Sequence, residues 1–441
     1  GDLPPASCVI CPKQSNDLSE NKELAGVGLA YKVSQALLSQ RRVDGVDVNS
    51  LLDLVALGTI ADMVPLTGEN RFLAKKGLQE IRKGKRIGLV KLAEVSGLGI
   101  QNVTSGNIGF TLAPRLNAAG RLKHDEEETM ELFKFCRAAC DDVYNLGLGT
   151  LSVQMLIEKD ASLATKFAEK LSVLNAKRQA STREAVEKTI QVIDPETPPE
   201  FIAVVDETLS EGIIGLVASR LTDKYYRPSM VMTRTNNSEI MRASCRSISQ
   251  FHITQALDKC ADLMIRHGGH AAAAGLTIMK ENVNELIRRL TYYAEEVLCD
   301  AEKRTPQIMI DAEIPLSRLG ELNPCLEKCI SLLEPTGVGN PYPVFAVKNI
   351  RIKNPTIYGK QNQSQNSSIK NITEDVHLRF SLDTGQSGSV PPVVWFRANE
   401  EAEKVIPGCV INLAFTFEKN QYKKSEYYQL QVRDICFSPS L

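Results

Sequence analysis

The chain has 441 residues, which suits about three domains, and its 43% hydrophobic and 24% charged residues are those of an ordinary globular protein. The formal net charge of −1 excludes a globally basic surface, so any nucleic-acid site must be built from local charges. We find no apolar run long enough to span a bilayer and no secretory-type leader, so we expect no membrane association. Eleven cysteines, an odd number, argue against a disulfide framework and predict a reducing, cytoplasmic location.

The cysteine spacing gives little support to a zinc site. One CxxC pair and two CxxxC pairs are present, at Cys8/Cys11, Cys136/Cys140 and Cys325/Cys329. None has a second pair at zinc-finger spacing. Both CxxxC pairs fit one face of a helix, where cysteine acts as a small apolar residue, and this is the favoured interpretation.

Two helices are predicted first, over residues 24–38 and from Asn49-Ser50, a good capping pair, to a break at Gly58. Asp62 follows among apolar neighbours. A buried carboxylate needs a metal, a cation or backbone donors as its partner. The alternative is an aspartate that caps a helix or closes an Asx turn, and Asp62 taken alone favours that alternative.

Residues 71–91 contain eight Lys or Arg and one acid, Glu80. A run so one-sided is equally consistent with a phosphate-binding surface and with a solvated helix face. Residues 110–122 are predicted to form a loop in which Pro114 fixes a turn. Three polar residues lie in this loop among small ones: Arg115, Asn117 and Arg121. Two arginines beside a compact backbone suit bidentate phosphate binding, and ion pairs that pin the loop are the alternative.

The central part of the chain alternates between helix and strand. Residues 151–194 contain neither Pro nor Gly and are apolar in the first half and polar in the second, which predicts a helix of about 30 residues that links two domains. Two short apolar runs, 201–206 and 229–233, flank a predicted helix over 212–225. This alternation predicts a β-α-β unit.

A strand is predicted to end at residues 241–247, MRASCRS. Ser244 and Arg246 are two residues apart and therefore point to the same face of a strand, where together they can hold a terminal phosphate. A structural turn is the alternative.

A helix over 253–266 is predicted to lead into RHGGHAAAAGL, residues 266–276, and then into a strand over 276–279. Between Gly268 and Gly275 side-chain bulk is almost absent, so the ring of His270 stands in a cleared space. Backbone amides and an imidazole in such a space suit a phosphodiester. A turn followed by a tight contact between two elements is the alternative.

The last third of the chain predicts a closing helix, a linker and a barrel. The helix covers 283–297 and the polar linker covers 300–308. Short strands separated by turn clusters indicate a small barrel, with strands over 376–382, 392–396, 410–417 and 427–434. The aromatic and basic residues that could contact a single strand there are Trp395, Phe396, Arg397, Tyr422, Lys423 and Lys424, although Trp395 could equally lie in the core.

Four of these stretches resemble motifs of one superfamily. GGHAAAAG, from Gly268, is similar to the GGHxxAAG signature of the DHH-associated domain, which belongs to the DHH phosphoesterase superfamily. LLDLVALGTIADMVPLTGENR, from Leu51, resembles the fourth motif of the RecJ family in that superfamily. The sequences PRLNAAGR, from Pro114, and SCRS, from Ser244, resemble its PRxNAxGR and SxRS segments.

This resemblance extends from Pro4 to Ile435 and implies an α/β fold: a partial DHH domain, a long linking helix, an α/β DHH-associated domain and a C-terminal OB-fold β-barrel. The implied domains are 1–132 for the C-terminal part of the DHH phosphoesterase domain, 133–195 for an interdomain segment with the long helix, 196–300 for the DHH-associated domain and 301–441 for the OB-fold domain.

The implied function is a 5′→3′ exonuclease that degrades single-stranded DNA by Mn²⁺- or Mg²⁺-dependent hydrolysis in repair and recombination. Asp62 would be a catalytic metal ligand and would face His270 across a cleft, where His270 would hold the scissile phosphate. The implied DNA-binding residues are Arg115, Asn117, Arg121, Ser244, Arg246, Ser247, Gly268, Gly269 and His270. The implied state is a monomer whose partners are single-stranded DNA, a single-strand-binding protein and a helicase.

Two departures from the family pattern bear on activity. No Asp-His-His triplet occurs anywhere, and Ser210 stands where the family often has a histidine. We therefore expect the chain as given to be incomplete, to bind at most one metal weakly and to be inactive. Two alternatives remain: a phosphodiesterase for short oligonucleotides or cyclic dinucleotides, and a catalytically inactive single-strand-binding fragment. The PRxNAxGR segment and the barrel count against the first, since a dinucleotide needs no extended track.

Overall fold

The computed structural model describes residues 5–45, 47–121, 149–358, 376–385, 390–422 and 425–437. The chain divides into two compact units. The barrel unit comprises residues 1–36, 62–75 and 307–441, and the sheet unit comprises residues 37–61 and 76–306. No helix among the described ranges combines the length and the apolar character needed to cross a membrane.

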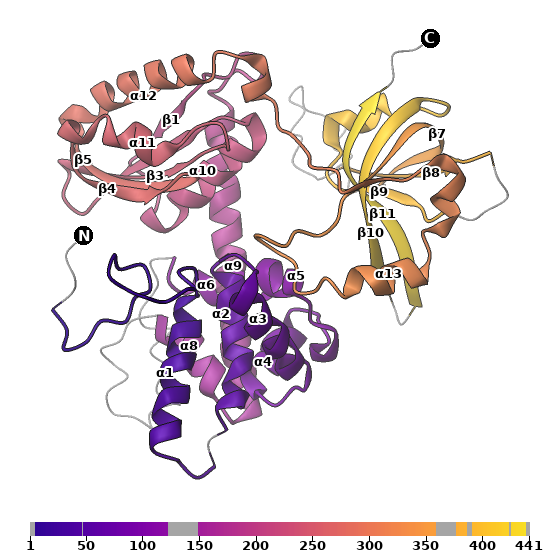
Figure 1. Cartoon of the computed structure of the whole chain (residues 1–441). Coiled ribbons are helices and arrows are strands. Elements are labelled where there is room, and N and C mark those ends of the chain that lie inside the picture. Colours follow the sequence, from indigo (N-terminus) through magenta and orange to yellow (C-terminus); the bar gives the residue numbers. More distant parts are fainter. Residues whose placement is uncertain are drawn as a thin grey trace. The chain divides into compact units, whose positions relative to one another are not determined.

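The barrel unit is built around a closed five-stranded barrel (Figure 1). Its strands are β7 (Phe345–Tyr358), β8 (His377–Asp383), β9 (Val393–Trp395), β10 (Val410–Tyr422) and β11 (Ser425–Phe437), and β10 closes the barrel by pairing with β7. A two-residue strand, β6 (Ala312–Glu313), extends β7, and α13 (Pro324–Ser331) precedes the barrel. The four strands predicted from sequence are confirmed, and β7 was missed.

Alternate residues of the barrel strands point inward, as the period of two requires. The largest fully buried side chains of this core are Phe380, Phe415 and Phe417. The barrel therefore has a conventional packed interior, and any ligand must bind its rim or its outer face.

The sheet unit begins with helices. They are α2 (Leu52–Ala61), α4 (Ile87–Val95), α5 (Ser105–Asn107), α6 (Ala113–Ala118), α8 (Gly149–Ile157) and α9 (Ala161–Ile190); α1 (Gly26–Gln40) and α3 (Gly68–Arg82) contribute residues to both units. The predicted N-cap at Asn49-Ser50 is wrong, because Asp47 caps a 3₁₀ turn that leads into α2. The predicted break at Gly58 is also wrong, because α2 continues to Ala61.

The long helix is confirmed, but it begins later than its apolar stripe suggested. Asp160 caps α9 by accepting a hydrogen bond from the backbone N–H of Leu163. Glu158 accepts from the backbone N–H groups of Lys159 and Asp160, and these bonds separate α8 from α9. The 30 residues of α9 contact α4, α6 and α8 as well as α10 (Glu211–Tyr225).

A five-stranded mixed sheet forms the rest of this unit, in the order β1-β2-β3-β5-β4. Its strands are β1 (Ile202–Val205), β2 (Ser229–Arg234), β3 (Ile240–Arg246), β4 (Met264–His270) and β5 (Ala273–Met279). β1 and β2 are parallel and joined by α10, so the predicted β-α-β unit is confirmed. In Figure 1, α10 lies on one face of the sheet, and α11 (Ile253–Asp258) and α12 (Val283–Val297) lie on the other.

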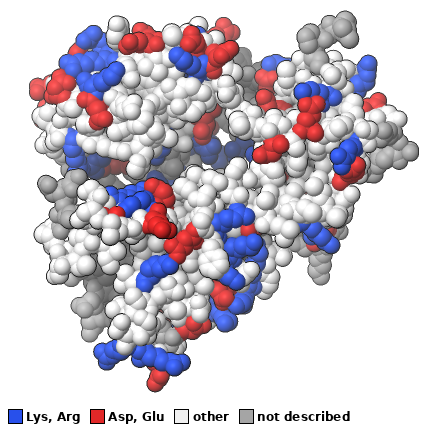
Figure 2. Space-filling model, in the orientation of Figure 1, with Lys and Arg blue, Asp and Glu red and all other residues white. Residues whose placement is uncertain are grey.

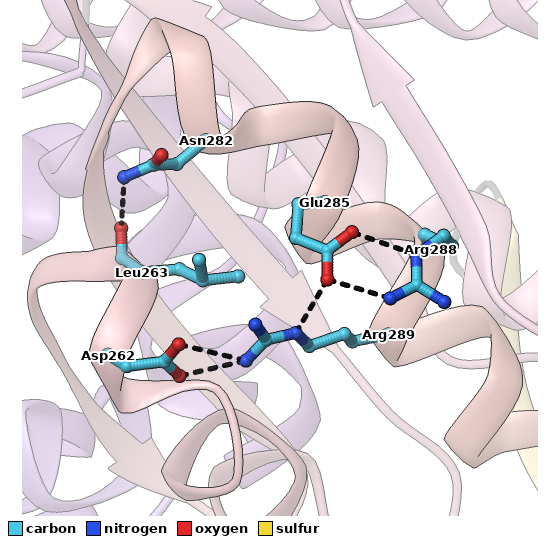
Figure 3. Close-up of polar contacts among 6 residues, drawn as sticks. All are labelled: Asp262, Leu263, Asn282, Glu285, Arg288 and Arg289. Atoms are coloured by element: carbon cyan, nitrogen blue, oxygen red, sulfur yellow. Dashed lines mark hydrogen bonds and ion pairs between the residues drawn. The ribbon is translucent and has the colours of Figure 1, made fainter.

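The predicted helix over 253–266 is wrong beyond Asp258. A 3₁₀ turn, Ala261–Leu263, follows α11, and Met264 to His270 then form the edge strand β4. Figure 3 shows how α12 fixes the start of this strand: Arg289 donates to both carboxylate oxygens of Asp262 at 2.9 and 3.0 Å, and Asn282 donates to the carbonyl of Leu263 at 3.2 Å. These long-range contacts override the helical pattern of the local sequence.

Candidate nucleic-acid interface

Ser244 and Arg246 lie on the same face of β3, as the strand period predicted. Arg246 Nη1 donates to Ser244 Oγ at 3.2 Å and to the carbonyl of Cys245 at 2.8 Å. This face is covered by α10, and Gly215 of that helix lies against the pair. A Cβ at Gly215 would lie 2.9 Å from Ser244 Oγ and 3.1 Å from Arg246 Nη2. Because Gly215 has no side chain, there is room beside it for the Ser244 hydroxyl and the Arg246 guanidinium.

Arg121 reaches the same region from the end of the PRLNAAGR segment. Its backbone touches the first turn of α10 so closely that a Cβ at Gly212 would lie 1.7 Å from the carbonyl oxygen of Arg121. Burial lowers the pKa of Arg246, and the positive charge of Arg121 lowers that pKa further. Like charges that are held together in this way favour an anion between them.

A depression of about 450 Å³ adjoins these groups. It is lined by Gly120, Arg121, Ser210, Glu211, Gly212, Thr235, Asn236, Asn237 and Arg242. Arg242 forms an ion pair with Glu211, so its charge is neutralised within the protein. Ser210 caps α10 by accepting from the backbone N–H of Gly212 at 3.4 Å, which gives this residue a structural role at the position where the family often has histidine.

The glycine-alanine run forms the tip of the β4–β5 hairpin. Gly268 pairs with Gly275, Gly269 with Ala274, and His270 with Ala273. Gly268, Gly269 and His270 are all exposed, so the hairpin presents bare edge-strand backbone beside an imidazole. The sequence left two interpretations of this run, a phosphate-binding backbone and a turn followed by a tight contact. The hairpin contains the turn, and its exposed backbone is accessible to a phosphate.

Ser247 and its neighbours hold this hairpin in place. The Ser247 amide donates to the carbonyl of Ala272 at 2.9 Å, and its hydroxyl donates to the carbonyl of Phe251 at 2.6 Å. Thr254 Oγ1 donates to the carbonyl of His270 at 2.8 Å. Of the two nearby histidines, His267 is hydrogen-bonded to Asp258 at 2.7 Å. His270 is thus the exposed ring, and the Ser247 hydroxyl already has a structural partner.

The predicted loop around Pro114 is wrong, because Pro114 occupies the first turn of α6. Arg115 projects from this helix, donating to the carbonyl of Thr111 at 2.7 Å and to Ser172 Oγ of α9 at 3.1 Å. Burial lowers the pKa of Arg115. These bonds pack Arg115 between α6 and α9, and its contact with a phosphate stays a prediction. Asn117 is exposed.

Asp62 does not have the buried, apolar setting that its neighbours in the sequence suggested. It follows the last residue of α2 and is exposed, as is Met63 beside it. The buried carboxylate of this motif is Asp53, which accepts from Arg86 Nε at 2.6 Å and from Arg86 Nη2 at 3.0 Å. Asp62 lies in the barrel unit and His270 in the sheet unit, and their facing one another stays a prediction.

Most of the basic run 71–91 has partners within the protein. Besides Arg86, Arg71 donates to the carbonyls of Leu333 and Pro335, and Arg82 donates to the carbonyl of Val103. Lys83 pairs with Glu80, and Lys91 pairs with Glu94. Five of the eight basic side chains therefore have partners within the protein, and phosphate binding by this run stays a prediction. Over the face of the molecule that Figure 2 shows, groups of Lys and Arg are interspersed with Asp and Glu.

In the barrel unit, three aromatic rings meet at adjacent strand ends. His377 lies 5.4 Å from Tyr358 and 5.5 Å from Phe396 between ring centroids. Phe396 is 46% exposed and Tyr358 is 40% exposed, so both present ring surface to solvent. Trp395 packs against the barrel core, which agrees with the second of its two predicted roles, a core residue and not a contact for the strand. Lys423 and Lys424 lie outside the described residues, as does the side chain of Tyr422.

Sequence reasoning did not single out Arg178 of α9 and Arg220 of α10. The charge of each acts on the same group of arginines, because Arg121 and Arg220 both lower the pKa of Arg178. The only signal in the sequence was that both are arginines on predicted helices, and other charged residues on those helices share that property. Their convergence depends on how α9 packs against α10.

A metal site is not formed by these residues. No group of three or more His, Cys, Asp or Glu suited to a metal ion occurs within the described ranges. Cys325 and Cys329 share α13 but are exposed, contrary to the expectation that they pack as small apolar residues. Cys136 and Cys140 lie outside the described residues.

Comparisons with known proteins identify two domains. Residues 199–296 match the DHHA1 domain model, and residues 310–434 match the RecJ OB domain model. A crystal structure of RecJ in complex with Mg²⁺ from Thermus thermophilus is similar with a TM-score of 0.73 and 26% sequence identity, covering 98% of this chain and 58% of that one. A second structure of that protein was solved with Mn²⁺ and has the same TM-score and identity.

Among curated proteins, the single-stranded-DNA-specific exonuclease RecJ of Dickeya dadantii (strain 3937) is 32% identical over 452 residues, covering 98% of this chain and 71% of that protein. The enzyme of the same name from Bacillus subtilis (strain 168) is 29% identical over 443 residues. The chain spans 50% of the length of that second relative. The chain belongs to the RecJ family, because the alignments with these relatives cover nearly all of it, two domain models match it, and its architecture combines a barrel with a sheet.

Proposed function

We propose that this chain is the part of a 5′→3′ single-stranded-DNA exonuclease that binds the strand and its 5′ end. Ser244 and Arg246, held under Gly215 beside Arg121, are the observation that carries the proposal. A hydroxyl and guanidinium groups on a rigid strand suit a terminal phosphate. The relatives named as single-stranded-DNA-specific exonucleases supply the substrate class. The roles in repair and recombination that the family resemblance implies are part of the same proposal.

The exposed hairpin at Gly268, Gly269 and His270 would receive the adjacent phosphodiester. Bare backbone lets the strand approach, and the imidazole can donate a hydrogen bond to a phosphate oxygen. The Ser247 amide and hydroxyl fix the hairpin tip, so Ser247 would act by positioning. Asn117, Arg121 and the packed Arg115 would flank the same track. For the chain itself we propose the domain boundaries 132, 195 and 300; the matched ranges 199–296 and 310–434 support the proposal of separate domains on either side of residue 300.

The whole protein would use Mn²⁺ or Mg²⁺, the ions present in the related structures. The described residues do not fit such an ion by themselves, because Asp62 is a single exposed carboxylate and the sequence contains no Asp-His-His. We therefore assign no hydrolytic step to this chain. Its own contribution is to bind and orient the strand, which is the entropic part of catalysis.

Two assays of the 441-residue chain test this proposal. With Mn²⁺ and 5′-labelled single-stranded DNA we expect no release of nucleotide. With the same DNA and no metal we expect binding that weakens steeply as salt rises, since phosphate contacts release counterions. Nucleotide release would contradict the absence of a metal centre. Binding that ignores salt, or that prefers duplex, would contradict the assignment of a single-strand track.

We further propose that the protein acts as a monomer, with a single-strand-binding protein and a helicase as partners that supply unpaired DNA. The family context supports this, since a strand-specific exonuclease needs its substrate unwound and kept open. Light scattering on the purified chain would test the first point, and pull-down with a purified single-strand-binding protein would test the second. A stable dimer would contradict the proposed monomer. The absence of an interaction with the single-strand-binding protein at physiological salt would contradict the proposed partnership.

A further inference from the structure

The turn of the β4–β5 hairpin is held from outside by residues 247–254, the segment that leads from the end of β3 into α11. Three successive backbone carbonyls at the turn each accept one hydrogen bond from this segment. The donors are Thr254 Oγ1 to the carbonyl of His270 at 2.8 Å, the Ile253 amide to that of Ala271 at 3.0 Å and the Ser247 amide to that of Ala272 at 2.9 Å. Three consecutive peptide groups are therefore fixed.

The residues of the turn do not fix its conformation by themselves. Ala271 and Ala272 connect His270 to its strand partner Ala273, so the hairpin has a two-residue connection. Such connections favour turns with a positive φ at one or both residues, which Gly, Asn and Asp adopt most readily. Neither of these two described alanines has a positive φ. The hydrogen bonds from the 247–254 segment therefore stabilise a turn that its own sequence does not favour.

The 247–254 segment is attached to the core of the sheet unit. Phe251 and Ile253 are 1% and 0% exposed and belong to that core. The Ser247 hydroxyl donates to the carbonyl of Phe251 at 2.6 Å, which ties the start of the segment to its buried part. The three donors therefore hold the turn at one place relative to the sheet.

Fixing the carbonyls also fixes the direction of the amide groups. In a planar trans peptide the carbonyl of one residue and the N–H of the next point in opposite directions. Because the carbonyls of His270 and Ala271 point to the 247–254 segment, the N–H groups of Ala271 and Ala272 point away from it. Both alanines are exposed, and neither N–H has an acceptor among the described residues. Successive backbone N–H groups that are free in this way suit an anion.

The strand register brings the turn into line with the pair that carries the proposed function. His270 pairs with Ala273 of β5, and Ala273 pairs with Arg246 of β3. Residues that are directly opposite in antiparallel strands lie on the same face of a sheet. The imidazole of His270 therefore lies on the face that carries Ser244 and Arg246.

We infer that Thr254 is a positioning residue of the strand-binding site, because it turns the amides of Ala271 and Ala272 toward the phosphodiester that His270 receives. The inference rests on the proposed function, and it adds to that function two amide donors and the residue that orients them. Thr254 makes this contribution without touching DNA, since its hydroxyl donates to the carbonyl of His270.

Substitutions at Thr254 test the inference through the affinity of the 441-residue chain for oligothymidylate. Thr254→Val keeps the shape of the side chain and removes the donor, so affinity should fall about threefold to tenfold, the range for one lost hydrogen bond. Thr254→Ser keeps the donor and should keep the wild-type affinity. Thr305→Val is the matched control and should not change affinity, because the Thr305 hydroxyl also donates to a carbonyl of the sheet unit, that of Ala301 at 2.9 Å, in the segment after α12.

A second measurement observes one of the amides directly. His270-Ala271 is the only His-Ala step in the sequence, so histidine labelled with ¹³C at the carbonyl and alanine labelled with ¹⁵N mark a single peptide bond. A nuclear magnetic resonance spectrum that selects this bond reports the Ala271 amide alone. Oligothymidylate should move the amide proton of the wild type downfield, since the amide gains an acceptor, and should move it less in Thr254→Val.

An Ala271 amide that does not move when the wild type binds the oligonucleotide overturns the inference, even if Thr254→Val fails to fold. Equal affinity of the wild type and a folded Thr254→Val chain, or a loss of affinity in Thr254→Ser as large as in Thr254→Val, does the same. In each of these cases the wild type still binds the strand, and the proposed function stands. Failure of the wild type to bind any single strand overturns the proposed function itself.

Discussion

Gly268 and Gly269 are neighbours in the hairpin but differ in what a side chain would meet. A Cβ at Gly268 would find nothing within 4 Å, whereas a Cβ at Gly269 would lie 2.3 Å from the carbonyl oxygen of Ala273. We expect Gly268→Ala to change the free energy of unfolding by less than about 1 kcal/mol and to weaken single-strand binding, because its methyl group would occupy space used by the phosphate. Denaturant unfolding and a binding titration measure the two quantities. Unaltered binding would show that the strand does not pass Gly268.

Gly269→Ala provides the contrast. The backbone contact with Ala273 must shift, so we expect destabilisation of about 1–3 kcal/mol. A variant as stable as the wild type would mean that the hairpin differs from the one described.

The buried pair of Asp53 and Arg86 allows a prediction about stability alone. Removing the guanidinium leaves a buried carboxylate without its charged partner, which typically costs about 3–5 kcal/mol. We expect Arg86→Ala to lower the free energy of unfolding by that order, as measured by denaturant unfolding. If Arg86 instead bound single-stranded DNA, the variant would keep its free energy of unfolding and lose affinity for the DNA.

At the scale of elements, the sequence could predict the features that depend only on the period with which side chains repeat along a strand or helix. The alternation in MRASCR placed Ser244 and Arg246 on one face of β3 correctly, because side chains alternate along any strand. RHGGH was assigned to a helix end and a loop, because its strand character comes from pairing with β5 and from the Arg289–Asp262 contact.

The loop after β1 gives a prediction for acid stability. Asp206 accepts from Thr208 and from Lys188 of α9, and these hydrogen bonds, opposed by burial, lower its pKa to about 2 from the ordinary 3.8. A carboxyl group whose pKa is lower in the folded state stabilises the fold above its unfolded pKa and loses that contribution as pH falls. We therefore expect Asp206→Asn to be less stable than the wild type at pH 6. The difference in melting temperature should shrink as pH falls from about 4 to 2, and a constant difference would contradict the assignment.

The aromatic cluster at the barrel's strand ends carries its own prediction. A base that stacks on exposed Phe396 contributes about 1–3 kcal/mol, so Phe396→Ala should weaken binding of long single strands and leave a dinucleotide unaffected. Tyr292→Ala is the control, since Tyr292 is also an exposed ring but belongs to α12 of the sheet unit. Equal effects of the two substitutions in a fluorescence anisotropy titration would contradict the prediction that the aromatic cluster contacts the single strand.

At the scale of the whole molecule, the chain contains a barrel that matches the RecJ OB domain and a sheet that matches the DHHA1 domain, and the described residues form no metal site. The family and the fold class could be predicted from motifs of contiguous residues, which can be recognised without knowledge of the packing. The exposed position of Asp62 could not, because its apolar neighbours Ile60 and Met63 differ in burial once α2 ends at Ala61.

The most direct test of the account locates the 5′ end on the protein. A single strand with a photoreactive 5′-terminal nucleotide would be bound to the 441-residue chain, cross-linked, and mapped by peptide mass spectrometry. We predict cross-links in β3 and α10 that disappear in Arg246→Gln. Cross-links confined to the barrel unit, or unchanged in that variant, would contradict the claim that the sheet unit holds the 5′ end.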